Sequence, residues 1–394
     1  MPSRRIKISL QPGVLQWARE RARVSRDELA RKMQVNVDRV VEWEETGKIS
    51  VAQADRLAER THTPLGLLYL SKPPEDKLPI PDFRTRHFDA SPLRVSLDLL
   101  ETVYAMQRRQ DWMRDDLIEN GAEPLEFVGG FSRTYSHVEV ASAMRDVLRM
   151  PLGWAEDIST WIAALRFLRS KLDAAGVLVV FNGVVGNSTS RKLDPDEFQG
   201  FALVDEYAPL IFVNNADFIA AKMFTLVHEL AHVFVGESGV SQFERMQPSQ
   251  NETERFCDQA AAEFLVPESS FRDLWNLVDR NTVALTGVSF ESIARQFKVS
   301  AIVAARRALD LDLIDFDTFF AFYENHKHQG GTIPSTADGG NFWNTQRWRI
   351  GPRFAAAVAR AVKEGRLLYR DAYRLTGLRE GTFDDMPEKM GIDL

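Results

Sequence analysis

Two histidines and a glutamate lie close together in the order His228-Glu229-Leu230-Ala231-His232. On a helix, residues four positions apart project from the same face, so the two imidazoles are placed as a pair of metal ligands must be. Glu229 would then lean over the position where a water sits beside the metal. Apolar residues flank the motif, and a buried histidine pair without a partner is costly. The pattern predicts a metal site with a general base, the alternative being a chance occurrence on an amphipathic helix.

A third metal ligand is expected downstream, because a catalytic zinc ion takes three protein ligands and keeps a fourth position for water. The candidate segment is 251–265, which has the apolar spacing of a helix. Glu254 and Asp258 lie four residues apart there, so one could bind the metal while the other accepts a hydrogen bond from a ligand histidine. Glu252 lies near the helix start, and Glu263 is about two and a half turns beyond Glu254. Both are alternatives, as is a solvated surface role for Glu254.

The composition describes a globular protein: 44% of the 394 residues are hydrophobic and 27% are charged, and the length suits two or three domains. Cys257 is the only cysteine, which excludes internal disulfides and a thiolate-rich metal cage. The N-terminus lacks the apolar core of a signal peptide, and no run is long enough to span a bilayer. We therefore expect a cytoplasmic protein that is not attached to a membrane.

The net charge is −7, yet the first 70 residues carry more lysine and arginine than aspartate and glutamate. Such a basic module on an acidic body fits a DNA-binding segment and fits a solvated surface equally well. Within residues 1–71, apolar spacing and capping residues predict five short helices, at 13–23, 26–33, 37–45, 50–60 and 64–70. The tight turn between the second and third of these helices is typical of a helix-turn-helix unit.

Four short segments of this region resemble the Cro/C1-type (Xre) helix-turn-helix domain: Trp17-Ala18-Arg19, Leu29-Ala30, Trp43-Glu44 and Gly47-Lys48. The resemblance implies a recognition helix whose residues Asn36, Val37 and Arg39 reach the base edges of a DNA operator, while Arg26 contacts phosphate. It also implies a homodimer on a two-fold site. The recognition helix is acidic for a phosphate-lined groove, and a protein-docking or dimerisation domain is the alternative.

A proline-rich connector over 72–90 is expected to be extended and to separate the domains, because proline fixes φ and has no N–H. Residues 91–285 are expected to hold helices and a zincin-like core, with three strands near 176–181, 198–204 and 209–214. The predicted fold class is mainly α with a small antiparallel β-sheet (α+β). An edge strand of that sheet could bind an extended peptide by strand addition.

Residues 286–394 are expected to form a helical C-terminal region. The segment 289–309 has a second helix-turn-helix pattern, which we interpret as packing around the core that carries the HExxH motif, in preference to a DNA contact. A glycine-rich stretch over 329–341 lacks the pattern of a phosphate-binding loop and is interpreted as a mobile cover or a turn.

The HExxH motif, Glu254-x-x-x-Asp258 and Ala261-Ala262-Glu263-Phe264 together resemble the ImmA/IrrE metallopeptidase family, whose pattern is gluzincin-like. The resemblance implies that His228, His232 and Glu254 bind Zn²⁺, that Glu229 is the general base and that Asp258 supports a ligand histidine. The residue that stabilises the oxyanion stays open, with Tyr207 and His137 as candidates.

The two resemblances in one chain imply a zinc-dependent endopeptidase coupled to a DNA-binding module. Its protein substrate would be a repressor or an antitoxin-like protein. The alternative is a non-proteolytic transcriptional regulator or antitoxin, whose metal domain serves as a sensor or binds a partner.

Overall fold

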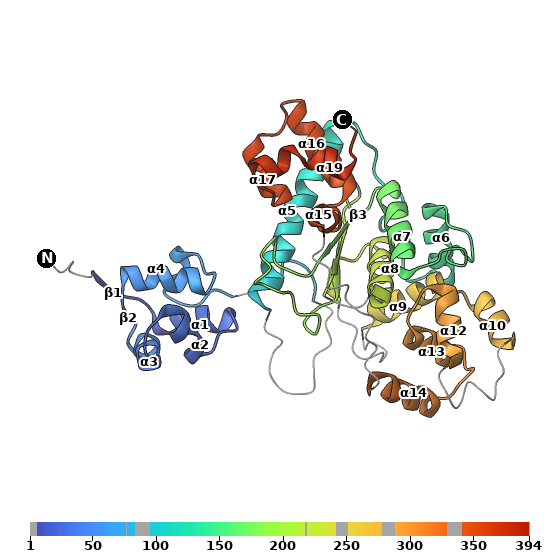
Figure 1. The fold of residues 1–394 in the computed structure, drawn as a ribbon, viewed down its shortest axis with the longest axis horizontal. Coiled ribbons are helices and arrows are strands. Elements are labelled where there is room, and N and C mark those ends of the chain that lie inside the picture. Colours follow the sequence, from blue (N-terminus) through green and yellow to red (C-terminus); the bar gives the residue numbers. More distant parts are fainter. Residues whose placement is uncertain are drawn as a thin grey trace. The chain divides into compact units, whose positions relative to one another are not determined.

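The computed structural model describes residues 6–75, 77–82, 95–216, 219–241, 251–277, 288–328 and 341–393. The chain divides into two compact units, one comprising residues 1–79 and 90–101 and the other residues 80–89 and 102–394. Both units are rich in helices, and the strands are few and short, so the predicted mainly helical α+β fold is confirmed (Figure 1). Among the described residues, no helix combines the length and the apolar character needed to cross a membrane.

The first unit holds the predicted N-terminal helices at nearly the predicted positions. They are α1 (Pro12–Arg21), α2 (Arg26–Met33), α3 (Val37–Thr46), α4 (Val51–Arg60) and the 3₁₀ helix η1 (Leu65–Tyr69). A two-stranded antiparallel ladder, β1 (Lys7–Ser9) with β2 (Lys48–Ser50), was not predicted. Each of its strands has three residues, which is too short for an alternating pattern to be recognised.

Local capping explains why these helices begin and end where they do. The side chain of Ser25 accepts from the Glu28 N–H at the start of α2, and that of Asn36 accepts from the Asp38 N–H at the start of α3. Gly47 ends α3 with φ of 68°, and a Cβ at this position would lie 1.9 Å from the carbonyl oxygen of Leu10. Only glycine fits this turn, which leads directly into β2.

The second unit contains a four-stranded sheet in the order β3-β5-β4-β6, with β3 (Leu178–Asn182), β4 (Gly200–Leu203), β5 (Leu210–Asn214) and β6 (Gly239–Ser241). The pairs β4–β5 and β4–β6 are antiparallel, but β3 pairs with β5 in parallel. The expectation of a purely antiparallel sheet was therefore wrong. After β3, the long connector 183–199 crosses the position that β5 later fills, so β5 lies between β3 and β4. The buried apolar run of β3 suits a parallel position.

Helices flank this sheet, and a further group of helices extends beyond it (Figure 1). They are α5 (Leu97–Glu119), α6 (His137–Leu148), α7 (Trp161–Ala175), α8 (Ile219–Val235), α9 (Glu252–Leu265), α10 (Glu268–Leu277), α12 (Val288–Phe297), α13 (Ala301–Asp310) and α14 (Phe316–His328). The HExxH helix α8 contacts β4 and β5 as well as α9. Apolar residues of α12 and α13 belong to the same buried core as those of α8 and α9.

The C-terminal helices are α15 (Phe342–Ile350), α16 (Pro352–Lys363), α17 (Tyr369–Thr376), α18 (Glu380–Asp384) and α19 (Met386–Met390). Helix α15 lies against β3, where Trp348 meets Phe181 edge-on at a ring distance of 4.9 Å. The Arg109 guanidinium of α5 donates to the carbonyl oxygens of Arg349 and Leu375, which joins these helices to the rest of the unit. Most of the glycine-rich stretch 329–341 lies outside the described residues.

Candidate metal centre

The HExxH motif lies on α8 and is buried on every side. His228, Glu229 and His232 have no exposed surface, and the intervening Leu230 and Ala231 are buried in the core. A helix that is apolar around most of its circumference is driven into the interior, and its few polar side chains must find partners there. The motif therefore lies in an interior site where its polar groups face one another.

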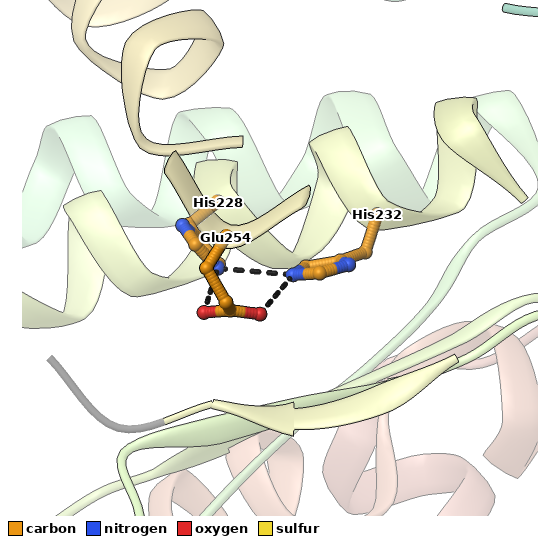
Figure 2. A group of neighbouring side chains, drawn as sticks. All are labelled: His228, His232 and Glu254. Atoms are coloured by element: carbon orange, nitrogen blue, oxygen red, sulfur yellow. Dashed lines mark hydrogen bonds and ion pairs between the residues drawn. The ribbon is translucent and has the colours of Figure 1, made fainter. Parts of the chain in front are cut away.

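Three side chains converge at this point. His228 and His232 project from one face of α8 toward Glu254 on α9, as Figure 2 shows. The two Nε2 atoms are 3.1 Å apart, His232 Nε2 lies 2.9 Å from Glu254 Oε1, and His228 Nε2 lies 3.3 Å from Glu254 Oε2. In a tetrahedral zinc site with bonds near 2.0–2.1 Å, ligand atoms are about 3.3 Å apart. The donor types and their spacing therefore fit a zinc ion.

Helix α9 delivers the third ligand through its first turn. The side chain of Asn251 caps the helix by accepting from the backbone N–H groups of Thr253 and Glu254. One turn later, Asp258 Oδ1 lies 2.9 Å from His228 Nδ1. A carboxylate on the other ring nitrogen favours the tautomer that leaves Nε2 available to a metal. The Asp258 carboxylate thus lies beside the ring nitrogen of His228 that does not face Glu254.

In the buried group, the charges of neighbouring side chains offset the effect of burial on the pKa values of His228 and Glu254. Burial acts to lower the pKa of His228, but the charge of Glu254 and the contacts to Asp258 and Glu254 outweigh it and raise the pKa well above its ordinary value. Burial acts to raise the pKa of Glu254, yet the charge and hydrogen bonds of the two histidines lower it to about 2. Glu254 is therefore held ionised, as a metal ligand must be.

Glu229 lies beside the ligands in a different environment. Burial raises the pKa of Glu229 to about 8, opposed by the charge of His228 and by the hydroxyl of Ser241. Neither carboxylate oxygen meets a partner at full hydrogen-bond geometry among the residues that the structure describes. A buried acceptor without a partner is costly, and functional sites are where such costs are retained. The carboxylate is thus available to a water or a substrate.

Two residues that the sequence reading missed shape the surroundings of Glu229. A Cβ on Gly200 would lie 2.8 Å from Glu229 Oε1, so the bare backbone of β4 leaves the space that the carboxylate fills. Ser241 pairs with Gly200 across β4 and β6. A glycine inside a strand pattern signals a close approach of this kind, whereas β6 is too short to be recognised from its sequence.

The alternative third ligands lie elsewhere. Glu252 is exposed and pairs with Arg133 at 3.4 Å. Glu263, near the other end of α9, forms a buried ion pair with Arg307 of α13. His137 is close to Glu263 and Arg307, whose charges influence its pKa, and burial lowers that pKa. Of the acidic residues considered on α9, Glu254 is the one grouped with the two histidines.

Tyr207 lies in the turn between β4 and β5, where its backbone N–H donates to Asp205 Oδ1. Within the described part of the chain, neither Tyr207 nor His137 belongs to the metal group. A role of Tyr207 or His137 in stabilising an oxyanion therefore stays a prediction.

The residues predicted to contact DNA all lie in the first unit. Asn36 is exposed and occupied as the cap of α3, and Val37 packs against the core of that unit. Arg39 forms an ion pair with Glu42 one turn along α3. Arg26 Nε lies 2.7 Å from Oε2 of Glu44, a buried residue that also pairs with an arginine of α1. Both candidate arginines therefore have carboxylate partners within this unit.

Comparison with known proteins assigns two segments of the chain. Residues 350–389 match a domain of unknown function (DUF8813), and residues 172–309 match the IrrE N-terminal-like domain. No curated protein matches the chain. The longer match begins at the end of α7 and runs through the sheet, α8 and α9 into α13, so it includes all three residues of the metal group. Residues 172–309 are therefore an IrrE N-terminal-like domain, and it carries a buried His-His-Glu group able to hold a metal ion.

Proposed function

We propose that the chain is a zinc-dependent endopeptidase, coupled to a DNA-binding helical unit, that regulates by cleaving a repressor or an antitoxin-like protein. The observation that carries the proposal is the buried group of His228, His232 and Glu254, with the Glu229 carboxylate beside it, which meets no partner at full hydrogen-bond geometry in the described part of the chain. Two neutral imidazoles and one carboxylate are a donor set that zinc favours, although manganese and iron accept similar ligands.

When bound, a zinc ion would supply Lewis acidity, polarising a peptide carbonyl and lowering the pKa of water to about 7. Glu229 would take a proton from the attacking water and pass it to the leaving amine. Burial raises the pKa of Glu229, which lets this side chain hold the proton between the two transfers. Asp258 would hold the His228 ring in orientation through Nδ1.

Metal content tests this proposal directly. Protein purified without chelators is expected to contain one zinc ion per chain by elemental analysis, and His228→Ala should lose it because two of three ligands do not hold the ion tightly. His137→Ala is the matched control: it removes a histidine outside the metal group and should keep the metal. A wild-type protein that binds no divalent metal would sink the proposal.

A non-proteolytic regulator is the second candidate. It is favoured by the pairing of Arg26 with Glu44 and of Arg39 with Glu42, which leaves the first unit better suited to docking a protein than to entering a DNA groove. Regulation in cells that survives Glu229→Gln unchanged would support this candidate, because the substitution keeps the fold and the ligands while removing the base.

A further inference from the structure

Strand β6 is the outer strand of the sheet on the side of the metal group. Its residue Ser241 pairs with Gly200, and Gly200 lies against the Glu229 carboxylate. Among the residues that the structure describes, the sheet order places β4 on one side of β6 and no further strand of the sheet on the other. An extended peptide that added to this outer side would therefore run past the catalytic carboxylate.

The outer side of β6 already has a partner, and it belongs to the proline-rich connector. The backbone N–H of Val240 donates to the carbonyl oxygen of Pro81 at 3.0 Å, and Asp82 forms a parallel β-bridge with Val240. Proline contributes no N–H of its own, so at Pro81 the connector can only accept. The connector thus uses the same backbone donor that an added peptide strand would need.

The contact is suited to being displaced. Pro81 and Asp82 are exposed and Ile80 is half-buried, so leaving β6 costs little buried apolar area beyond that of Ile80. Because the connector is covalently attached, however, its local concentration at β6 is on the order of millimolar. A free peptide must therefore bind better than this tethered segment, and weak or unspecific peptides are excluded.

We propose that residues 80–82 occupy the peptide-binding edge of the catalytic domain in the resting protein, and that a substrate must displace them from β6. Displacement by a substrate rests on the proposed peptidase function. The occupancy of β6 by residues 80–82 can be measured without any hydrolysis.

The test compares two full-length variants in which three connector residues become glycine. Ile80→Gly/Pro81→Gly/Asp82→Gly raises the entropic cost of ordering the segment at β6. Pro73→Gly/Pro74→Gly/Glu75→Gly makes the same kind of change in the same connector, away from the bridge to Val240. Three measurements are made: hydrogen–deuterium exchange of the peptide spanning β6, binding of a fluorescent Lys77–Asp82 peptide in the Glu229→Gln background, and hydrolysis of fluorescein-labelled casein.

The 80–82 variant is expected to exchange the β6 amides at least about fivefold faster than wild type and to bind the added peptide more tightly. It should also hydrolyse casein about tenfold faster, as expected when a larger fraction of molecules is competent to bind. The 73–75 variant should behave as wild type in all three measurements.

Equal β6 exchange in wild type and the 80–82 variant would overturn the proposal, because the segment would then not protect the strand. Equal stimulation of casein hydrolysis by both variants would overturn it as well, since connector flexibility and not the edge contact would be responsible. If no variant hydrolyses casein while exchange and peptide binding change as expected, occupancy of β6 stands and the peptidase function is what fails.

Discussion

At the scale of single residues, two buried glutamates of the site have different surroundings and therefore different pKa values. Glu254 faces both histidines, and its pKa falls to about 2, whereas Glu229 meets no partner at full hydrogen-bond geometry among the described residues and burial raises its pKa to about 8. A carboxylate that stays ionised serves as a ligand, and one that can hold a proton serves as a base. In the proposed mechanism, the same residue type thus takes two roles, decided by the surroundings of each side chain.

Glu229→Gln is expected to lower the rate of peptide hydrolysis by about 10²–10⁴-fold while leaving the zinc content unchanged, because the amide keeps the shape of the side chain but cannot take a proton. The measurement is casein hydrolysis together with elemental analysis. Glu252→Gln, which changes an exposed glutamate of α9, should keep wild-type activity. Full activity in the Glu229→Gln protein would show that another group is the base.

Asp258→Ala is expected to weaken zinc binding by about 10–100-fold, because the His228 ring loses the carboxylate 2.9 Å from Nδ1. Competition with a fluorescent chelator measures the affinity. Asp258→Asn keeps an acceptor oxygen and should recover part of the loss. An unchanged affinity in the alanine variant would mean that Asp258 does not support the ligand.

At the scale of elements, the site depends on how closely α8 lies on the sheet. The carboxylate of Glu229 reaches the backbone of β4 at Gly200, next to Thr225 of α8 and the carbonyl oxygen of Phe212 on β5. A side chain at position 200 would separate the helix from the strands. The separation of α8 and β4 is therefore set by a glycine that carries no chemistry of its own.

Gly200→Ala is expected to lower the stability of the protein by about 1–3 kcal/mol, because the added Cβ would lie 2.7 Å from Thr225 Cγ2 and 3.0 Å from the Phe212 oxygen. Turnover should fall further than zinc content, since Glu229 is displaced while the ligands remain. Thermal unfolding and casein hydrolysis measure the two effects. Gly381→Ala is the control, because a Cβ there meets nothing within 4 Å. Unchanged turnover in Gly200→Ala would show that the position of Glu229 is not set by this contact.

At the scale of the whole molecule, the chain combines two units whose proposed roles differ. The second unit contains the IrrE N-terminal-like domain and the C-terminal helices, which Arg109 of α5 joins to the rest of the unit. The first unit has its own core and its own caps, and the arginines predicted to bind DNA are paired with glutamates there. DNA binding would require these ion pairs to open. The Arg39–Glu42 pair is partly exposed and opens at little cost, whereas opening the Arg26–Glu44 pair would leave a buried carboxylate with one partner fewer.

If the first unit binds DNA, full-length protein should bind the promoter of its own gene with an affinity that falls steeply as salt rises. Glu42→Gln is expected to strengthen binding, because it removes a negative charge from α3 and releases Arg39. Glu59→Gln, an equal charge change on α4, should have less effect. Fluorescence anisotropy over a salt series measures both. An absence of binding even at low salt would favour the protein-docking function.

Much of this protein follows from its sequence, because the relevant signals are local. The capping residues Ser25 and Asn36 begin α2 and α3 where the sequence predicts, since a cap acts within three residues. The spacing of His228 and His232 determines that both imidazoles lie on one face of α8, and the spacing of Glu254 and Asp258 does the same on α9. Helical periodicity alone is sufficient for these statements.

The tertiary structure determines the features that depend on contacts between segments far apart in the sequence. The parallel pairing of β3 with β5, the short strand β6 and the approach of Gly200 to Glu229 arise from how the sheet packs under α8. The connector at Val240 and the pairing of Arg26 with Glu44 likewise join residues that no local pattern relates. Strand pairing and side-chain contacts depend on how the whole core is buried. The local spacing of residues along the chain therefore does not predict which distant segments become partners.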